Sequence, residues 1–315
     1  MHKLSTSSPA VPILETTPTA VRGDKPVAGV LWMIASGLCF VGLTAGVKHL
    51  GQEIPAAQSA FLRYFLGLIF LLPMVNTMRR EPMTPSLWRA FGWRGAMHTI
   101  GVILWFYAMT RIPLAEVSAM GYLNPIWISI GAVLFLGERI RLRRIVAIVI
   151  AILGALIILR PGLRELNAGH LAMLVTSLFF AASYLIAKRL SDQVSPTMIV
   201  GMLSITVTIG LAPFAIAVWE PITWTQAGWF LLLAGFATAG HYLMTFAFAA
   251  APISVTQPVT ALQLVWSVTL GALLFSEPVD MWVVGGGGMI VSAVIFIAFR
   301  EHQLRRAEKS ASVST

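Results

Sequence analysis

Residues 113–139 read PLAEVSAMGYLNPIWISIGAVLFLGER, and a diverged copy, PISVTQPVTALQLVWSVTLGALLFSEP, follows at residues 252–278. When the two stretches are aligned from their first residues, five positions keep the same residue type: Pro113, Leu123, Trp127, Leu134 and Glu138 match Pro252, Leu262, Trp266, Leu273 and Glu277. Each copy is long and apolar enough to cross a bilayer as a helix, which takes about 20 residues. The stretch therefore predicts a duplicated membrane helix.

A second pair of windows extends the duplication. When residues 28–48 are aligned with residues 168–188, Ala28, Gly29, Leu31, Met33, Leu38, Phe40 and Lys48 match Ala168, Gly169, Leu171, Met173, Leu178, Phe180 and Lys188. Apolar composition alone does not produce two such matches at nearly one offset, so we predict a tandem duplication of five spans. Because five is odd, the second half must enter the membrane from the opposite side, and such inverted halves are the architecture of alternating-access transporters.

The composition agrees with a membrane protein. Of 315 residues, 57% are hydrophobic and only 11% are charged, whereas soluble domains are about a quarter charged. The net charge of +9 is typical either of nucleic-acid binding or of basic loops on one side of a membrane, and the positions of the basic residues favour the loops. The single cysteine, Cys39, lies in an apolar run and predicts neither a disulfide framework nor a cysteine-based metal site.

Ten spans can be drawn, and their uninterrupted apolar runs predict an all-α integral membrane bundle rather than a barrel. The expected spans are Pro26 to Val47, Ala56 to Val75, Trp93 to Thr110, Leu114 to Leu136, Ile145 to Leu159, Gly169 to Ala187, Met198 to Trp219, Ala227 to Ala250, Ile253 to Phe275 and Trp282 to Phe299. They form two five-helix repeats at 27–160 and 161–300, between a disordered tail at 1–26 and a second tail at 301–315.

Basic residues predict the orientation of the bundle. With ten spans, seventeen of the 22 Lys and Arg residues fall on one side, and only Lys48, Arg111, Arg160 and Arg164 fall on the other. The positive-inside rule then places both termini in the cytoplasm. Arg63 is the one basic residue expected well inside a span.

Two carboxamides lie near the middle of the duplicated helix, Asn124 in the first copy and Gln263 in the second. A buried amide needs partners, so each either contacts a substrate or bonds a neighbouring helix. Pro125 and Pro258 both interrupt the backbone ladder close by, which is tolerated only against protein or a water-filled cavity. These residues favour a central polar cavity, although prolines also serve as simple kinks.

Aromatic and histidine side chains share the middle of the predicted bundle. Trp127 and Trp266 lie three residues beyond the paired amides, on about the same helix face. The remaining candidates for substrate binding are Trp105, Tyr107, Tyr184, His98 and His241. Stacking on these rings would suit a flat substrate, and core packing is the alternative for each one. His98 is expected close to the cytoplasmic surface.

Charged side chains are the last group of candidate functional residues. Arg63 would bind a substrate carboxylate, backbone carbonyls or Glu116. Glu138 and Glu277 end the twin helices, where solvated carboxylates are expected. No pair of carboxylates is expected at mid-membrane, which argues against carboxylate-based proton or sodium coupling. Glycines at Gly131, Gly137 and Gly285 to Gly288 predict close helix packing.

These features together resemble the drug/metabolite transporter superfamily of EamA type. The resemblance rests on ten spans in two halves, on NPIW followed by GER in the fourth span, and on the arginine within FLRYFLG of the second. The second copy departs from it, with Leu264 in place of Pro125 and SEP in place of GER. Within the superfamily the chain is most similar to the aromatic amino-acid exporters called YddG. That likeness implies a bacterial inner-membrane protein with a cavity between spans one to four and six to nine, and with spans five and ten peripheral.

Three functions remain open at this point. The first is export of amino acids or similar small metabolites by alternating access, with no cofactor and with the lipid bilayer as surroundings. The second is a multidrug exporter of aromatic compounds. The third is an intramembrane enzyme, which would require His98, His241 and Arg63 to converge. The physiological substrate, the energy source and the oligomeric state do not follow from the sequence.

Overall fold

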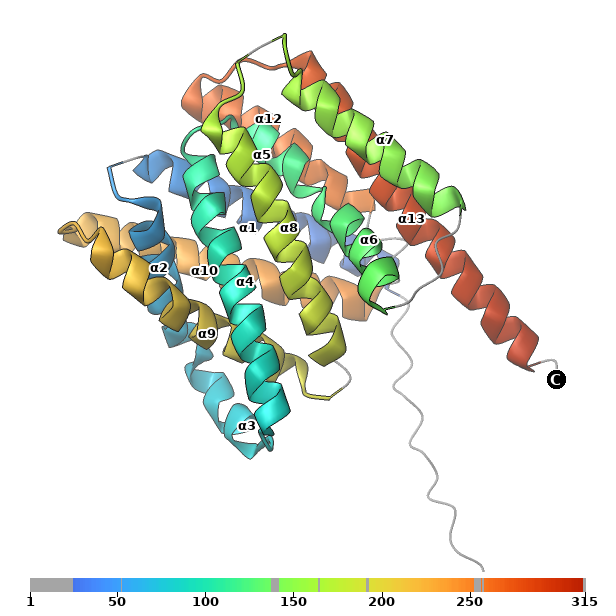
Figure 1. Cartoon of the computed structure of the whole chain (residues 1–315), viewed down its shortest axis with the longest axis horizontal. Helices are drawn as coiled ribbons and strands as arrows, with labels where there is room; N and C mark the ends of the chain where they lie inside the picture. Colours follow the sequence, from blue (N-terminus) through green and yellow to red (C-terminus); the bar gives the residue numbers. More distant parts are fainter. Residues whose placement is uncertain are drawn as a thin grey trace, which may run out of the picture.

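A computed structural model shows the chain as a bundle of helices (Figure 1). It describes residues 25–51, 53–136, 142–163, 165–190, 193–251, 256 and 258–313. The tail at 1–24, Gly137, Glu138, Arg164 and Pro252 lie outside the described residues, so the predictions that fall on them are not tested.

The helices fall into the ten expected spans. The first half contains α1 (Pro26–Leu50), then α2 (Ala56–Gly67), η1 (Leu68–Met74) and α3 (Val75–Arg80) in succession, then α4 (Pro85–Met109), α5 (Leu114–Gly121), α6 (Asn124–Leu136) and α7 (Leu142–Leu159). The second half contains α8 (Ala168–Leu190), α9 (Pro196–Ala217), α10 (Trp224–Ala250), η2 (Pro258–Ala261), α12 (Leu262–Phe275) and α13 (Met281–Val313). The all-α fold is confirmed.

Length and hydropathy alone identify only part of this set. Five described helices are long and apolar enough to cross a membrane, and three shorter apolar helices accompany them. The missing segments are those that carry arginines, as α4 does, or that are broken, as α5 and α6 are. A search for uninterrupted apolar stretches therefore undercounts the spans of this bundle.

Two helix ends were predicted wrongly. The third span begins at Pro85 rather than Trp93, because Thr84 caps the helix by accepting a hydrogen bond from the backbone N–H of Leu87 and proline follows at the first position. Helix α13 runs on to Val313, beyond the end at Phe299 that was expected for the tenth span.

Helix packing follows the duplication. Helix α1 lies along α10 as its counterpart α8 lies along α4, and α6 packs on α8 as α12 packs on α1. Helices α2 and α9, α5 and α12, and α7 and α13 pack directly on each other. Exchanging the halves reproduces all of these pairs, as expected for repeats related by a pseudo-two-fold axis. Figure 1 shows α7 and α13 together at one edge of the bundle, the peripheral position predicted for spans five and ten.

The duplication extends to single side chains. The ring of Phe40 lies on Gly240, where an added Cβ would be 3.1 Å from it. The ring of Phe180 lies on Gly101 in the same way, at 2.6 Å. Phe180 is the duplicate of Phe40 in the second aligned pair of windows, and Gly240 becomes the duplicate of Gly101 when the first alignment is extended back along the chain. The two contacts are therefore equivalent.

Hydroxyl groups reinforce the same two helix crossings. Ser36 donates a hydrogen bond of 2.8 Å to the carbonyl of Gly240. Thr176, its equivalent in the second half, donates one of 3.3 Å to the carbonyl of Gly101. Small residues and interhelical hydroxyl bonds are the usual means by which membrane helices approach closely.

Glycines also join the two peripheral helices. A Cβ added to Gly286 in α13 would lie 2.5 Å from the carbonyl oxygen of Gly154 in α7. Gly287 is similarly close to Leu264, at 2.7 Å, whereas Gly285 and Gly288 have no neighbour within 4 Å. The predicted close packing is therefore correct for two of the four consecutive glycines.

We expect Gly286→Ala to lower the free energy of unfolding by about 1 to 3 kcal/mol, because the new methyl group meets a backbone carbonyl that only helix separation can move. Gly285→Ala is the matched control and should leave stability unchanged or raise it, since its Cβ enters open space. Thermal unfolding in detergent measures both. Equal melting temperatures would show that the α7–α13 contact does not depend on this glycine.

Candidate substrate site

Both copies of the duplicated helix are interrupted in the middle of the bundle. Helix α5 ends at Gly121 and α6 begins at Asn124, next to the proline that lacks a backbone N–H. In the second half the 3-10 turn η2 precedes α12, which begins one residue before Gln263. The hydroxyl of Tyr122 donates a hydrogen bond to the carbonyl of Thr260, so the two interruptions contact each other. The predicted break is confirmed in the first copy, while most of the residues just before Pro258 lie outside the described part of the chain.

The paired amides have different surroundings. The side-chain oxygen of Asn124 is buried and has no hydrogen-bond partner among the described residues. Gln263 lies against α1, where a Cβ added to Gly37 would be 3.2 Å from its Cγ. A buried acceptor without a protein partner is suited to a hydrogen bond from a ligand or water. A direct role of either amide in substrate binding stays a prediction.

The paired tryptophans also differ. The indole N–H of Trp127 donates to the hydroxyl of Ser177 in α8 at 2.9 Å, which gives this ring a structural partner. The indole N–H of Trp266 is buried and has no such partner within the described part of the chain. Of the two, Trp266 is the better candidate for a ligand contact.

An aromatic cluster joins α2, α4 and α8. The ring of His98 stacks on Phe180, with 4.6 Å between ring centroids. Its two ring nitrogens lie 3.2 Å from the hydroxyls of Ser183 and Tyr64. Trp105, two turns along α4, contacts Phe180 edge-on at 6.3 Å. His98 is therefore a buried, hydrogen-bonded residue within the bundle, and its expected position near the cytoplasmic surface stays a prediction.

Two further candidates border open space beside this cluster. Tyr184 lies 6.4 Å from the rings of both His98 and Phe180, yet its side chain is 40% exposed. His241 in α10 is exposed as well, although its ring contacts Phe40 at 5.1 Å. Both side chains contact rings on neighbouring helices and are still exposed, as residues at the edge of a cavity would be.

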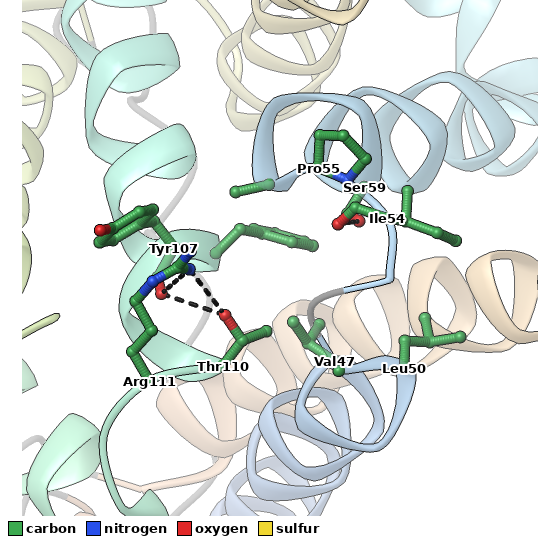
Figure 2. A pocket seen from close by; sticks show the side chains of 11 residues that line it. Val47, Leu50, Ile54, Pro55, Ser59, Tyr107, Thr110 and Arg111 are labelled. Carbon is green, nitrogen blue, oxygen red and sulfur yellow. Dashed lines mark hydrogen bonds between the residues drawn. The ribbon is translucent and has the colours of Figure 1, made fainter. Parts of the chain in front are cut away.

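Tyr107 belongs to a different place. It lines a small pocket of about 400 Å³, including space open to solvent, where α1 ends, α2 begins and α4 ends (Figure 2). There the guanidinium of Arg111 lies 3.6 Å from the Tyr107 ring centre and donates to the Tyr107 carbonyl and the Thr110 hydroxyl. Tyr107 is nine residues from His98, or about 13 Å along the helix, so the structure does not join it to the cluster.

Two arginines, not one, lie inside the bundle. Arg63 in α2 stacks on the ring of Tyr64, with 4.1 Å from the guanidinium carbon to the ring centre. Arg94, which the sequence analysis counted with the basic residues of the cytoplasmic side at the start of the third span, is the tenth residue of α4 and only 4% exposed. The capping sequence at Thr84 and Pro85 was the signal that would have placed Arg94 inside the helix.

Glu116 pairs with His170. The sequence analysis had given Glu116 as one of the possible partners of Arg63. Glu116 is buried and lies 2.5 Å from His170 at the start of α8, a residue that the sequence analysis did not single out. His170 also contacts the backbone of Asn167 through its other ring nitrogen. A histidine in the first turn of a span carries no pattern that distinguishes it from an interfacial residue, which is why this pair was missed.

Glu277 is not a solvated helix-end carboxylate either. Its Oε1 lies 2.5 Å from the ammonium of Lys48, which also donates 2.8 Å to the carbonyl of Ile112. Its Oε2 accepts a hydrogen bond of 2.9 Å from the backbone N–H of Leu114, the first residue of α5. This ion pair joins α1, α5 and α12 at one end of the bundle, called here the Lys48 end.

We expect Lys48→Met to lower the free energy of unfolding on the order of 3 kcal/mol, because it leaves the largely buried Glu277 carboxylate without its counter-charge. Lys48→Arg retains the charge and is the matched control. Glu277→Gln keeps an acceptor for Leu114 but loses the charge, so its loss should be similar to that of Lys48→Met. If the free energy of unfolding is unchanged in Lys48→Met, the ion pair of Lys48 with Glu277 does not contribute to stability.

A helical bundle of two inverted halves around an accessible polar and aromatic space is the structure of a secondary transporter. The chain belongs to the EamA-like transporter family, whose pattern matches residues 27–160 and again residues 167–299. The EamA part of the resemblance is thereby confirmed.

The curated relatives are bacterial transporters of several kinds. The chain is 30% identical to the riboflavin transporter of Rhizobium johnstonii, over 95% of this chain and 99% of that protein. It is 26% identical to the S-adenosylmethionine uptake transporter of Rickettsia prowazekii, over 87% and 93%. It is 25% identical to the pseudopaline exporter of Pseudomonas aeruginosa, over 87% and 97%.

A solved structure shares the fold. It matches at a TM-score of 0.57 with 16% identity, over 88% of this chain and 99% of that chain. Fold, family and relatives together make the chain a multi-pass protein of the bacterial inner membrane that transports small molecules and is not an enzyme. These relatives carry names other than amino-acid exporter, so the substrate is a separate question.

Proposed function

We propose that this chain carries small metabolites with a flat aromatic ring across the inner membrane by alternating access, and that it exports aromatic and other neutral amino acids. The observation that carries the proposal is the exposure of Tyr184 and His241 inside the bundle, beside the stacked rings of His98 and Phe180. Accessible aromatic faces between two inverted halves suit a flat ligand.

Polar groups near the helix interruptions support the same proposal. The unpartnered oxygen of Asn124 and the unpartnered indole N–H of Trp266 offer one acceptor and one donor. A few placed polar groups among aromatic side chains are the usual lining of a small-molecule site. An amino acid supplies both the ring and the polar groups that such a lining would bind.

Riboflavin is a second candidate substrate. The riboflavin transporters of Rhizobium johnstonii and Vibrio cholerae are 30% and 29% identical to this chain, over 95% and 90% of its length. Riboflavin carries a flat three-ring system with polar edges, which the same aromatic lining would accept. The names of the relatives include both uptake and export, so transport should be measured in both directions.

Export of aromatic cations is disfavoured. Arg63 and Arg94 place two positive charges in the interior, and the described ion pairs place no carboxylate beside either one. Like charges across a binding surface are costly, so a cationic drug would be repelled.

Purified protein in liposomes should accelerate the equilibration of labelled tryptophan, phenylalanine, threonine or riboflavin over that in empty liposomes. The proposal expects a faster rate for at least one of the ring-bearing compounds. If none of them moves faster than in empty liposomes, the proposal is wrong. Comparison of the four rates decides between the amino-acid and the riboflavin candidates.

Replacing Asn124 or Gln263 by Ala should slow transport about tenfold, since a lost hydrogen bond in a buried site is worth about 1 to 3 kcal/mol. Gln193→Ala is the matched control, because this amide is exposed and bonds only the carbonyl of Arg189 among the described contacts. Size-exclusion profiles establish that each variant is folded. Wild-type rates in both variants would assign the two amides to helix packing.

A further inference from the structure

Two guanidinium groups in the bundle have hydrogen-bonding capacity that the protein does not use. In Arg94, one terminal nitrogen donates 2.7 Å to the carbonyl of Ile199 in α9, while the buried Nε has no partner among the described residues. In Arg63, the Nε is likewise buried and without a partner in the described part of the chain. Arg63 is partly exposed, whereas Arg94 is 4% exposed.

The described carboxylates close to the bundle are engaged elsewhere. Each has a partner other than the two arginines: Glu81 with Ser195, Glu116 with His170, Glu277 with Lys48 and Asp280 with Arg160. Glu53, Glu165 and Glu220 are exposed. None of the ion pairs found among the described residues includes Arg63 or Arg94. An arginine within a membrane span is costly, and it is usually paired with an opposite charge or faces water.

The two arginines form one positively charged region. Hydrogen bonding of His98 to Tyr64 connects the helix that carries Arg63 to the helix that carries Arg94. Arg94 lies one turn before His98 on α4, and Arg63 stacks on Tyr64, the residue that bonds His98. The region thus holds two guanidinium groups and a tyrosine hydroxyl, which can donate hydrogen bonds to an anion, while both ring nitrogens of His98 already have partners.

The region also has access to the open space of the site. Tyr184 on α8 and His241 on α10 are both exposed. Arg63, being partly exposed, is the guanidinium that a ligand can reach, whereas Arg94 is buried and held by its bond to Ile199. Arg63 can therefore contact a ligand directly, and the positive charge of Arg94 adds to the electrostatic potential around it.

We infer that the transported compound carries an anionic group, a carboxylate or a phosphate, which Arg63 binds and which Arg94 stabilises electrostatically. The planar guanidinium presents its N–H groups in a fork that matches two oxygens of such a group. The inference rests on the proposed transport function and adds a substrate class to it. Of two compounds with the same ring system, the site should bind the one that carries the anionic group more tightly.

Matched compounds test the inference on the wild-type protein alone. Tryptophan and tryptamine differ by the carboxylate, and riboflavin 5′-phosphate and riboflavin differ by the phosphate. Binding to purified protein in detergent, measured by titration calorimetry, should be about tenfold to a hundredfold tighter for the anionic member of at least one pair. Equal affinity within both pairs, or no binding of any of the four, would overturn the inference.

Variants of the arginines test which residue causes the preference for the anionic compound. Arg63→Gln should abolish the preference for the anionic compound, and Arg63→Lys should retain part of it, since the charge stays but the fork is lost. Arg89→Gln removes an exposed arginine from the same helix as Arg94 and should leave the preference unchanged. A full preference in a folded Arg63→Gln protein would also overturn the assignment. If that variant does not fold, the wild-type pairs still decide.

The two proposals fail in different ways. If liposomes show transport of tryptophan or riboflavin while the affinities within each pair are equal, the anion site is wrong and the transport function stands. If the anionic compounds bind tightly and Arg63→Gln loses them, but no compound crosses the membrane, the site stands and the transport function is wrong.

Discussion

The structure depends on one constraint: backbone groups freed from a helix cannot face lipid. The fourth span breaks between α5 and α6, and the ninth passes through the 3-10 turn η2 before α12, each at a proline that lacks a backbone N–H. The bundle satisfies the constraint by turning the breaks toward each other, so that Tyr122 bonds the carbonyl of Thr260 across the two halves. Everything near that contact, including Asn124 and Gln263, is thereby held between the halves rather than at the lipid surface.

The inverted duplication explains why this arrangement can move. The crossing of α1 with α10 repeats in the crossing of α8 with α4, down to the phenylalanine that lies on a glycine in each. Because the two crossings are equivalent and opposite in orientation, each half can take up the conformation of the other while keeping the same kind of helix contact. The ion pair of Lys48 with Glu277 joins helices at one end of the bundle, whereas the two interior arginines have no counter-charge among the described ion pairs.

Much of the fold followed from the sequence, because two pairs of windows aligned at nearly the same offset determined the number and the pairing of spans. The site followed less well. Pattern and spacing singled out Trp105, His98 and Tyr184, which the structure joins through Phe180, but they also grouped Tyr107 with them. Pairings such as Glu116 with His170 depend on where two helices cross. The periodicity of apolar residues along the sequence does not show these crossing points. The burial of Arg94 was missed because the third span was started at Trp93, which puts this arginine at the span end, although the capping residues Thr84 and Pro85 precede it in the sequence.

Distances at the two ends of the bundle test the account most directly. Spin labels at Glu53 and Leu166 probe the Lys48 end, and labels at Gln193 and Val27 probe the other end. Gln193 is the duplicate of Glu53, and Val27 aligns within one residue of Leu166. All four are exposed, and Cys39→Ser supplies the background. Pulsed dipolar spectroscopy should show the two distances changing in opposite senses when a transported compound is added to protein in liposomes. Two distances that change in the same sense, or that stay constant while the compound binds, would contradict alternating access between inverted halves.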